Sequence, residues 1–138
     1  MISYHSDGAP VPHLPRRTIN AWVKQVAALH GRRVGDIAYI FCDDERILEV
    51  NRQYLGHDYY TDIITFDYSD ARRISGDIFI SVDTVRSNAA LFNTTCEQEL
   101  HRVIIHGILH LCGINDKGPG ERQIMEQAEN EALSLLAL

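Results

Sequence analysis

Residues 96–113, CEQELHRVIIHGILHLCG, constrain the fold more than any other segment of the chain. Thr95 and Gln98, three positions apart, form the pattern of a capping box, and Gly113 is typical of the end of a helix. Apolar residues occupy most positions between these two signals. A helix this apolar is stable only when it is buried, so we expect it at the centre of the fold.

A narrow polar stripe interrupts this predicted helix. At about 100° per residue, one sector about 80° wide contains Glu99, Arg102, His106 and His110. Two histidines four residues apart lie one above the other, which is the spacing that two imidazoles need to bind one metal ion at about 2.0 Å. The alternative is a pair of core histidines bonded to backbone carbonyls. Two buried imidazoles side by side resist joint protonation, and a bound cation would relieve that problem.

A third ligand is expected from the residues that follow the helix. Gly113 can adopt the left-handed conformation that turns the chain back over the helix end. Asp116 is the only anionic oxygen donor among the next residues, so we predict a metal site of His106, His110 and Asp116. The alternative for Asp116 is a solvated turn aspartate. Three protein ligands leave a position for water, whose pKa Zn²⁺ can lower toward 7. The carboxylate also admits Mn²⁺ or Fe²⁺.

The other segments predict an α+β fold. Apolar spacing typical of helices occurs at 16–31, 43–56 and 83–93, and a last helix is expected from Gly118, with Pro119 in its first turn. The residues at 1–8 and 35–43 favour strands, and 61–69 with 76–83 favour a hairpin. We therefore predict a single domain over 1–138, in which several helices cover a small mixed β-sheet and the metal site lies on a buried central helix.

Composition limits the possible functions. The formal net charge of -6 argues against nucleic-acid binding through a general basic surface, although a local basic cleft remains compatible with it. Three cysteines without C-x-x-C spacing predict neither a disulfide framework nor a cysteine-rich zinc site, which favours a reducing cytosol. We also expect no secretory leader and no membrane span.

The stretch HGILHLCGIND, followed by Glu121, Met125 and Glu129 at four-residue steps, resembles the YbeY family, whose pattern reads H-G-x-L-H-L-x-G-x-D-H. TDIITF, GDIFIS and VNRQYLGHDYYTD resemble further motifs of that family, in the same order. The resemblance implies an α+β fold, bound zinc and a cytoplasmic location. It also implies a single-strand endoribonuclease that acts on ribosomal RNA or ribosomal subunits, in rRNA maturation and ribosome quality control.

The chain departs from the family pattern at two positions. Asp116 replaces the usual third metal-binding histidine, and Leu55 replaces an arginine thought to serve substrate phosphate or catalysis. Arg52 or His57 could substitute for that arginine, and we predict Arg52 as a catalytic residue beside the three ligands. Its alternative is a solvated helix arginine.

Three further hypotheses follow. Glu121 or Glu129 could act as general base, with orientation of a ligand histidine or capping of a helix as the alternatives. Arginines and aromatics could line a groove for single-stranded RNA, with solvated surface and core packing as the alternatives: Arg32, Arg33, Arg72, Arg73, Arg86, Tyr59, Tyr60 and Phe66. Leu55 also permits a metal-stabilised RNA- or ribosome-associated factor with little catalysis. A zinc-dependent peptidase is disfavoured because Gly107 occupies the position of the glutamate in H-E-x-x-H.

Overall fold

The computed structural model of the protein describes residues 1–57 and 61–136. Within these residues the chain forms four strands and five helices. In chain order they are β1 (Ile2–Ser6), α1 (Arg16–Leu29), β2 (Arg33–Cys42), α2 (Asp44–Leu55), β3 (Ile63–Asp67), β4 (Arg73–Ser81), α3 (Val82–Leu91), α4 (Cys96–Leu111) and α5 (Glu121–Ser134).

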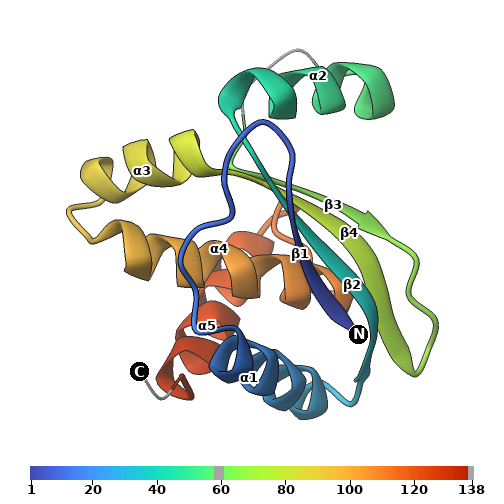
Figure 1. Cartoon of the computed structure of the whole chain (residues 1–138). Coiled ribbons are helices and arrows are strands. Elements are labelled where there is room, and N and C mark those ends of the chain that lie inside the picture. Colours follow the sequence, from blue (N-terminus) through green and yellow to red (C-terminus); the bar gives the residue numbers. More distant parts are fainter. Residues whose placement is uncertain (58–60, 137–138) are drawn as a thin grey trace.

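The strands form one mixed sheet in the order β1-β2-β4-β3 (Figure 1). β2 pairs in parallel with both β1 and β4, whereas β3 runs antiparallel to β4 as the second arm of a hairpin. This arrangement confirms the predicted α+β class, the mixed sheet and the hairpin. It also places α3 and α4 directly after the central strand β4.

The main core lies between one face of the sheet and helices α1, α4 and α5. Alternate residues of β2 are buried on that face, as period-two side-chain alternation requires: Ile37, Tyr39 and Phe41. A smaller cluster beneath α2 contains Cys42, Ile47, Val50 and Ile64. All three cysteines are free, in agreement with the expected absence of a disulfide framework.

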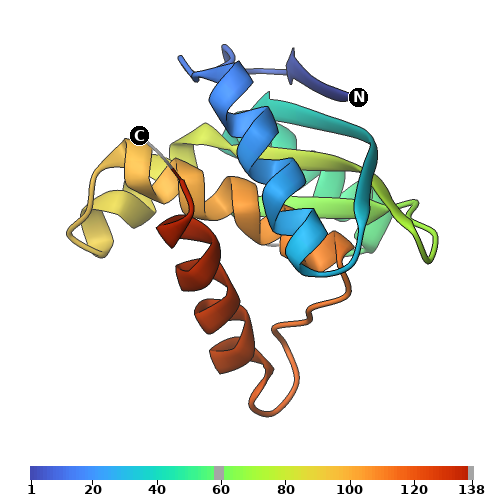
Figure 2. The same ribbon diagram turned by 90° about the horizontal axis from the view of Figure 1, so that it is seen from below.

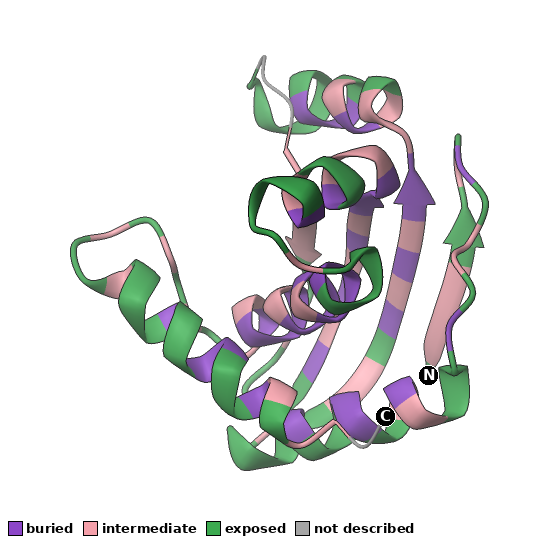
Figure 3. Ribbon diagram, turned by 90° about the vertical axis from the view of Figure 1, so that its left-hand side faces the viewer, coloured by how far each residue is buried: buried purple, intermediate pink, exposed green. Residues whose placement is uncertain are grey.

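Helix α4 is central and mostly buried (Figure 3). Thr95 and Gln98 form the predicted capping box at its start. The hydroxyl of Tyr39 donates a hydrogen bond of 3.1 Å to the carbonyl of Ile104, which fixes α4 against β2. At Gly107, a Cβ would lie 3.1 Å from side-chain atoms of Ile63 and Ile78, so the glycine lets the helix approach two strands closely. No helix in the described residues is long and apolar enough to cross a membrane.

A long connection leads from the end of α4 to α5, which packs against α4 (Figure 2). The prediction that Pro119 lies in the first turn of this helix is wrong, because α5 begins at Glu121. Gly120 adopts φ +76°, a left-handed conformation that interrupts helical geometry, so the helix starts after it. The indole of Trp22 donates a 2.7 Å hydrogen bond to the carbonyl of Ala132 and joins α1 to the far end of α5.

Candidate metal centre

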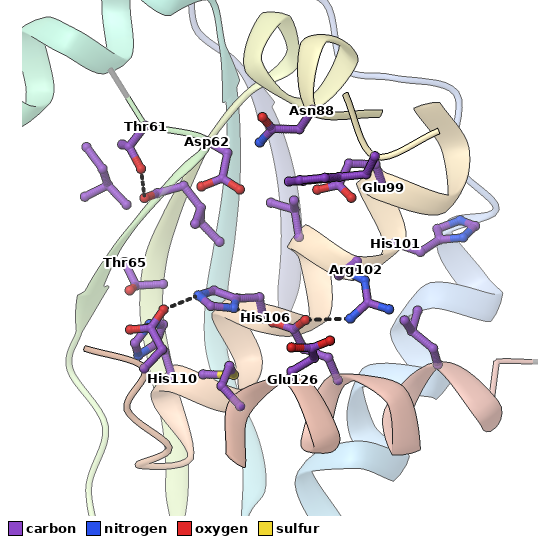
Figure 4. Close-up of a pocket in the computed structure, with 18 of the residues that line it drawn as sticks. Thr61, Asp62, Thr65, Asn88, Glu99, His101, Arg102, His106, His110 and Glu126 are labelled. Atoms are coloured by element: carbon purple, nitrogen blue, oxygen red, sulfur yellow. Dashed lines mark hydrogen bonds and ion pairs between the residues drawn. The ribbon is translucent and has the colours of Figure 1, made fainter. Parts of the chain in front are cut away.

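A pocket of about 1370 Å³ lies beside α4, between β3, α5 and the corner that joins α3 to α4. The predicted polar stripe of α4 lines this pocket, and Figure 4 shows its side chains along one wall. The stripe therefore faces a cavity, which is the outcome expected for polar side chains on an otherwise buried helix.

The end of α4 returns the chain toward the pocket. Gly113 adopts φ +98°, the predicted left-handed conformation. Its amide bonds to the carbonyl of His110 at 2.9 Å, and the amide of Ile114 bonds to that of Leu109 at 3.0 Å. This pair of bonds is a Schellman motif, which reverses the chain direction at the helix end. Asp116 follows three residues later and lines the same pocket as the histidines.

His106, His110 and Asp116 place one potential ligand atom each within 4.8 Å of the others. The two imidazole rings are 4.7 Å apart and nearly perpendicular. Nε2 of His106 lies 3.4 Å from Oδ2 of Asp116, and Nε2 of His110 lies 3.4 Å from Oδ1. Two ligand atoms about 2.0 to 2.1 Å from a tetrahedral zinc are about 3.3 Å apart, so each of these two separations is close to the spacing of neighbouring ligand atoms in a zinc site.

One further observation favours a cation over a solvated aspartate. Oδ1 of Asp116 is buried and has no aligned hydrogen-bond donor, even though His110 is within 3.4 Å. A buried carboxylate oxygen without a partner is costly, and a metal ion would satisfy it. The donor set of two imidazoles and a carboxylate therefore fits a divalent metal ion.

Glu129 holds the other side of His106. Its Oε2 lies 2.6 Å from Nδ1 of His106, and its Oε1 accepts a 2.7 Å hydrogen bond from Arg102. Arg102 also donates to the side chain of Asn130 at 2.9 Å. With a proton on Nδ1, the His106 ring keeps its Nε2 lone pair toward Asp116 and the pocket. Because both oxygens of Glu129 are occupied, this side chain orients the His106 ring, and it is not available as a general base.

The surroundings separate the pKa values of the two histidines. Burial lowers the pKa of His106, but the hydrogen bond and charge of Glu129 outweigh it, and the net direction is upward. Burial lowers the pKa of His110, and the neighbouring His106 lowers it further. Burial raises the pKa of Glu129, yet its bonds to His106 and Arg102 bring it below its usual value. The His110 ring is therefore the readier of the two to offer a neutral nitrogen.

The opposite end of the pocket contains Asp62, Asn88 and Glu99, which Figure 4 shows facing one another from the residue before β3, from α3 and from α4. Burial raises the pKa of Asp62. Burial also raises the pKa of Glu99, and the charge of Asp62 adds to this effect. Sequence reasoning placed Glu99 on the polar stripe without a role and did not single out Asp62 or Asn88. These three residues meet only in the folded chain.

Other predicted residues lie elsewhere. Arg52 is exposed on α2 and does not line the pocket, whereas Leu55 and His57 do. Tyr59 and Tyr60 fall outside the described residues. Phe66 packs edge-on against Tyr54 and Phe79. None of the five arginines proposed for an RNA groove lines the pocket, whose described cationic side chains are instead Arg102, Lys117 and Arg122.

The chain is similar in sequence and in fold to known proteins. The family model described as Endoribonuclease YbeY matches residues 6–137. A protein of that name from Phocaeicola vulgatus is 67% identical over 138 residues, covering 100% of both chains. Another from Bacteroides thetaiotaomicron is 64% identical over 134 residues, covering 97% of this chain and 98% of the relative. The solution structure of TM1509 from Thermotoga maritima matches with a TM-score of 0.61 and 26% identity, covering 97% of this chain and 90% of that one.

Proposed function

Because the chain belongs to the YbeY endoribonuclease family, we propose that it is a metal-dependent hydrolase that cleaves single-stranded RNA in rRNA maturation and ribosome quality control in the cytoplasm. The observation that supports metal dependence is the convergence of His106, His110 and Asp116 in one pocket. Zn²⁺ is the first candidate because two imidazoles and a carboxylate suit it, and Mn²⁺ or Fe²⁺ are alternatives.

The three ligands would hold the cation at the base of the pocket, beside α4. A bound divalent ion supplies electrostatic stabilisation of the charge that develops on a phosphodiester during cleavage. His106 and His110 must be neutral to bind it, and Glu129 keeps the His106 proton on Nδ1 so that Nε2 remains available. Arg102 neutralises Glu129 and prevents an uncompensated buried charge when His106 is neutral.

Substrate would enter over the exposed side chains at the pocket mouth. Lys117 follows the ligand Asp116, and Arg122 lies in the first turn of α5. Both line the pocket and can contact phosphates of a single strand, in a chain that is otherwise acidic. Arg52, one turn before Leu55 on α2, remains a proposed contributor to phosphate binding or catalysis.

Leu55 favours a second candidate function. This side chain is 42% exposed and lines the pocket wall at the position where the family pattern has an arginine. An apolar side chain there offers no hydrogen bond to phosphate. A metal-stabilised RNA- or ribosome-associated factor with little catalysis would have the same metal centre and the same pocket.

One experiment separates these candidates. The purified protein is analysed for metal content and then incubated with single-stranded RNA, with and without a chelator. We expect cleavage that the chelator removes and that His106→Ala abolishes, while Lys24→Ala, which changes an exposed lysine of α1 outside the pocket, retains it. RNA that is bound but left intact with Zn²⁺, Mn²⁺ or Fe²⁺ would contradict the nuclease and favour the binding factor. Cleavage of peptides in place of RNA would favour the peptidase.

A further inference from the structure

The Glu99 side chain is largely buried, and its carboxylate faces the pocket without a hydrogen-bond partner among the described residues. The residue is 6% exposed, and its side chain makes no hydrogen bond or contact ion pair with any described residue. Its nearest cationic neighbour on α4, Arg102, is bonded to Glu129 and Asn130 instead. A buried carboxylate normally has partners, because the free energy of losing its hydration is otherwise not recovered. The missing partner of Glu99 would therefore be supplied by a bound ligand.

The surroundings of Glu99 indicate what kind of ligand fits. Asp62 adds a second carboxylate and Asn88 adds an amide, and both face Glu99 across the pocket (Figure 4). Phe92 lines the same pocket with 61% of its surface exposed, so an aromatic ring is available for stacking. Together these side chains offer several acceptors, one amide and one ring face. Single-stranded RNA is commonly bound by this combination, with its bases stacked on aromatic rings and hydrogen-bonded at their edges.

Guanine is the base whose hydrogen-bonding edge matches this set. It is the only common RNA base with two adjacent N–H donors on its Watson–Crick edge, N1–H and the N2 amino group, and a carboxylate can accept from both. The Asn88 amide can donate to the guanine O6. Adenine presents an acceptor at N1, which would face the carboxylate lone pairs, and uracil presents one donor between two acceptors. A site built from acceptors rejects such bases because its own buried groups would remain unpaired.

The distance along α4 agrees with a nucleotide that spans both ends of the pocket. Glu99 and His106 are seven residues apart, which corresponds to about 10 Å along a helix. Both lie on the same helical face and line the same pocket. One nucleotide can place its phosphate beside the histidines and its base beside Glu99.

We infer that Glu99, Asp62, Asn88 and Phe92 form a guanine-binding subsite that selects where the strand is positioned at the metal centre. This inference rests on the proposed action on single-stranded RNA and specifies its sequence preference. A second divalent cation is the competing occupant of two carboxylates. However, Asp62 and Glu99 do not belong to any group of three or more potential ligands in the described residues, which contain only the group at Asp116.

The test compares the binding of labelled oligoribonucleotides by fluorescence anisotropy with the metal-loaded protein. Each probe is a uridine nonamer whose central base is uracil, guanine, adenine or hypoxanthine, and a denaturing gel confirms that it is intact after measurement. We expect guanine to bind about tenfold more tightly than adenine or uracil, the effect of one good carboxylate pairing. Hypoxanthine, which lacks the N2 amino group, should lose several-fold of this gain.

Two variants locate the preference. Glu99→Gln should reduce the guanine preference to less than about twofold, because the amide presents one acceptor and its own donors to the base. Glu131→Gln, which changes an exposed glutamate of α5 outside the pocket, should retain it. The comparison of guanine with hypoxanthine uses the unaltered protein, so it holds even if a variant folds poorly.

Several outcomes would overturn the subsite. Equal binding of guanine and adenine would do so while leaving RNA binding intact, and a guanine preference that survives Glu99→Gln would place it elsewhere. A preference that requires added Mg²⁺ would assign the two carboxylates to a cation. Failure of all four probes to bind would instead remove both this inference and the proposed function.

Discussion

Glu129 and Glu99 lie at opposite ends of one pocket and are buried to nearly the same extent, 8% and 6% exposed, yet their pKa values shift in opposite directions. Burial raises both. At Glu129 the hydrogen bonds from His106 and Arg102 outweigh that effect, whereas Glu99 has only the distant charge of Arg102 to oppose it. Burial alone therefore does not determine the state of a carboxylate. Glu129 already has its hydrogen-bond partners and positions His106 before any ligand binds. Glu99 would gain hydrogen-bond partners only from a bound ligand.

The largest expected effect concerns the end of the pocket where His106, His110 and Asp116 converge. Asp116→Ala should reduce bound metal from near one equivalent to a trace, because it removes one of three ligands and the only anionic one. The fold should change little, since Asp116 lies in a connection outside the helices. Elemental analysis after dialysis measures the metal, and circular dichroism checks the fold. Full metal occupancy in this variant would exclude Asp116 as a ligand.

Proton competition should be the next largest effect. Metal affinity should fall as pH drops below about 6.5, by about a hundredfold at pH 5, because two imidazoles must each lose a proton to bind. The raised pKa of His106 means that protons compete there at higher pH than at His110. Titration of the protein with Zn²⁺ at a series of pH values measures this dependence. A flat profile would argue against histidine ligands.

Glu129→Gln should weaken metal binding by about tenfold, at the lower end of the range for residues that orient ligands, because glutamine keeps one acceptor for His106. It should also lower stability at pH 7. The folded pKa of Glu129 is below its unfolded value, so its contribution is present above the unfolded pKa and is lost as pH falls through the folded one. Thermal melts across pH test this, with Glu126→Gln, an exposed neighbour on α5, as the control.

The smallest expected effect is at Glu99, where the change in stability with pH should have the opposite sign to that at Glu129. The folded pKa of Glu99 lies above its unfolded value, so stability falls as pH rises from the unfolded pKa through the folded one. Glu99→Gln should therefore raise the melting temperature at pH 7, and the gain should vanish near pH 4, where the unfolded carboxyl also holds its proton. If Glu99→Gln and Glu129→Gln both lowered stability at pH 7, the proposed difference between the two ends would be wrong.

Local sequence signals predicted most of the fold and one end of the pocket. Apolar periodicity located the helices and strands, and the capping box at Thr95 and the left-handed Gly113 fixed the limits of α4. Because Asp116 follows that turn closely, the histidines and the carboxylate could be associated from spacing alone.

The remaining features depend on contacts distant in sequence. The choice between Glu121 and Glu129 as the partner of His106 follows from how α5 packs on α4, which no local pattern specifies. The presence of Asp62, Asn88 and Glu99 in one pocket likewise requires the start of β3 to lie beside α3 and α4. The start of α5 was misplaced because proline at a first turn is a common signal, whereas here the conformation of Gly120 delays the helix.

The Schellman turn at Gly113 also has a consequence for the order in which the protein matures. His106, His110 and Asp116 lie within eleven consecutive residues, counted from 106 to 116, so the loop that a bound ion would close is short and would cost little entropy. All three residues precede α5 in the chain, so their approach to one another does not require α5 to be docked. In the proposed metalloprotein, an ion could therefore bind before α5 packs against α4, and the docking of Glu129 beside His106 would then tighten the centre.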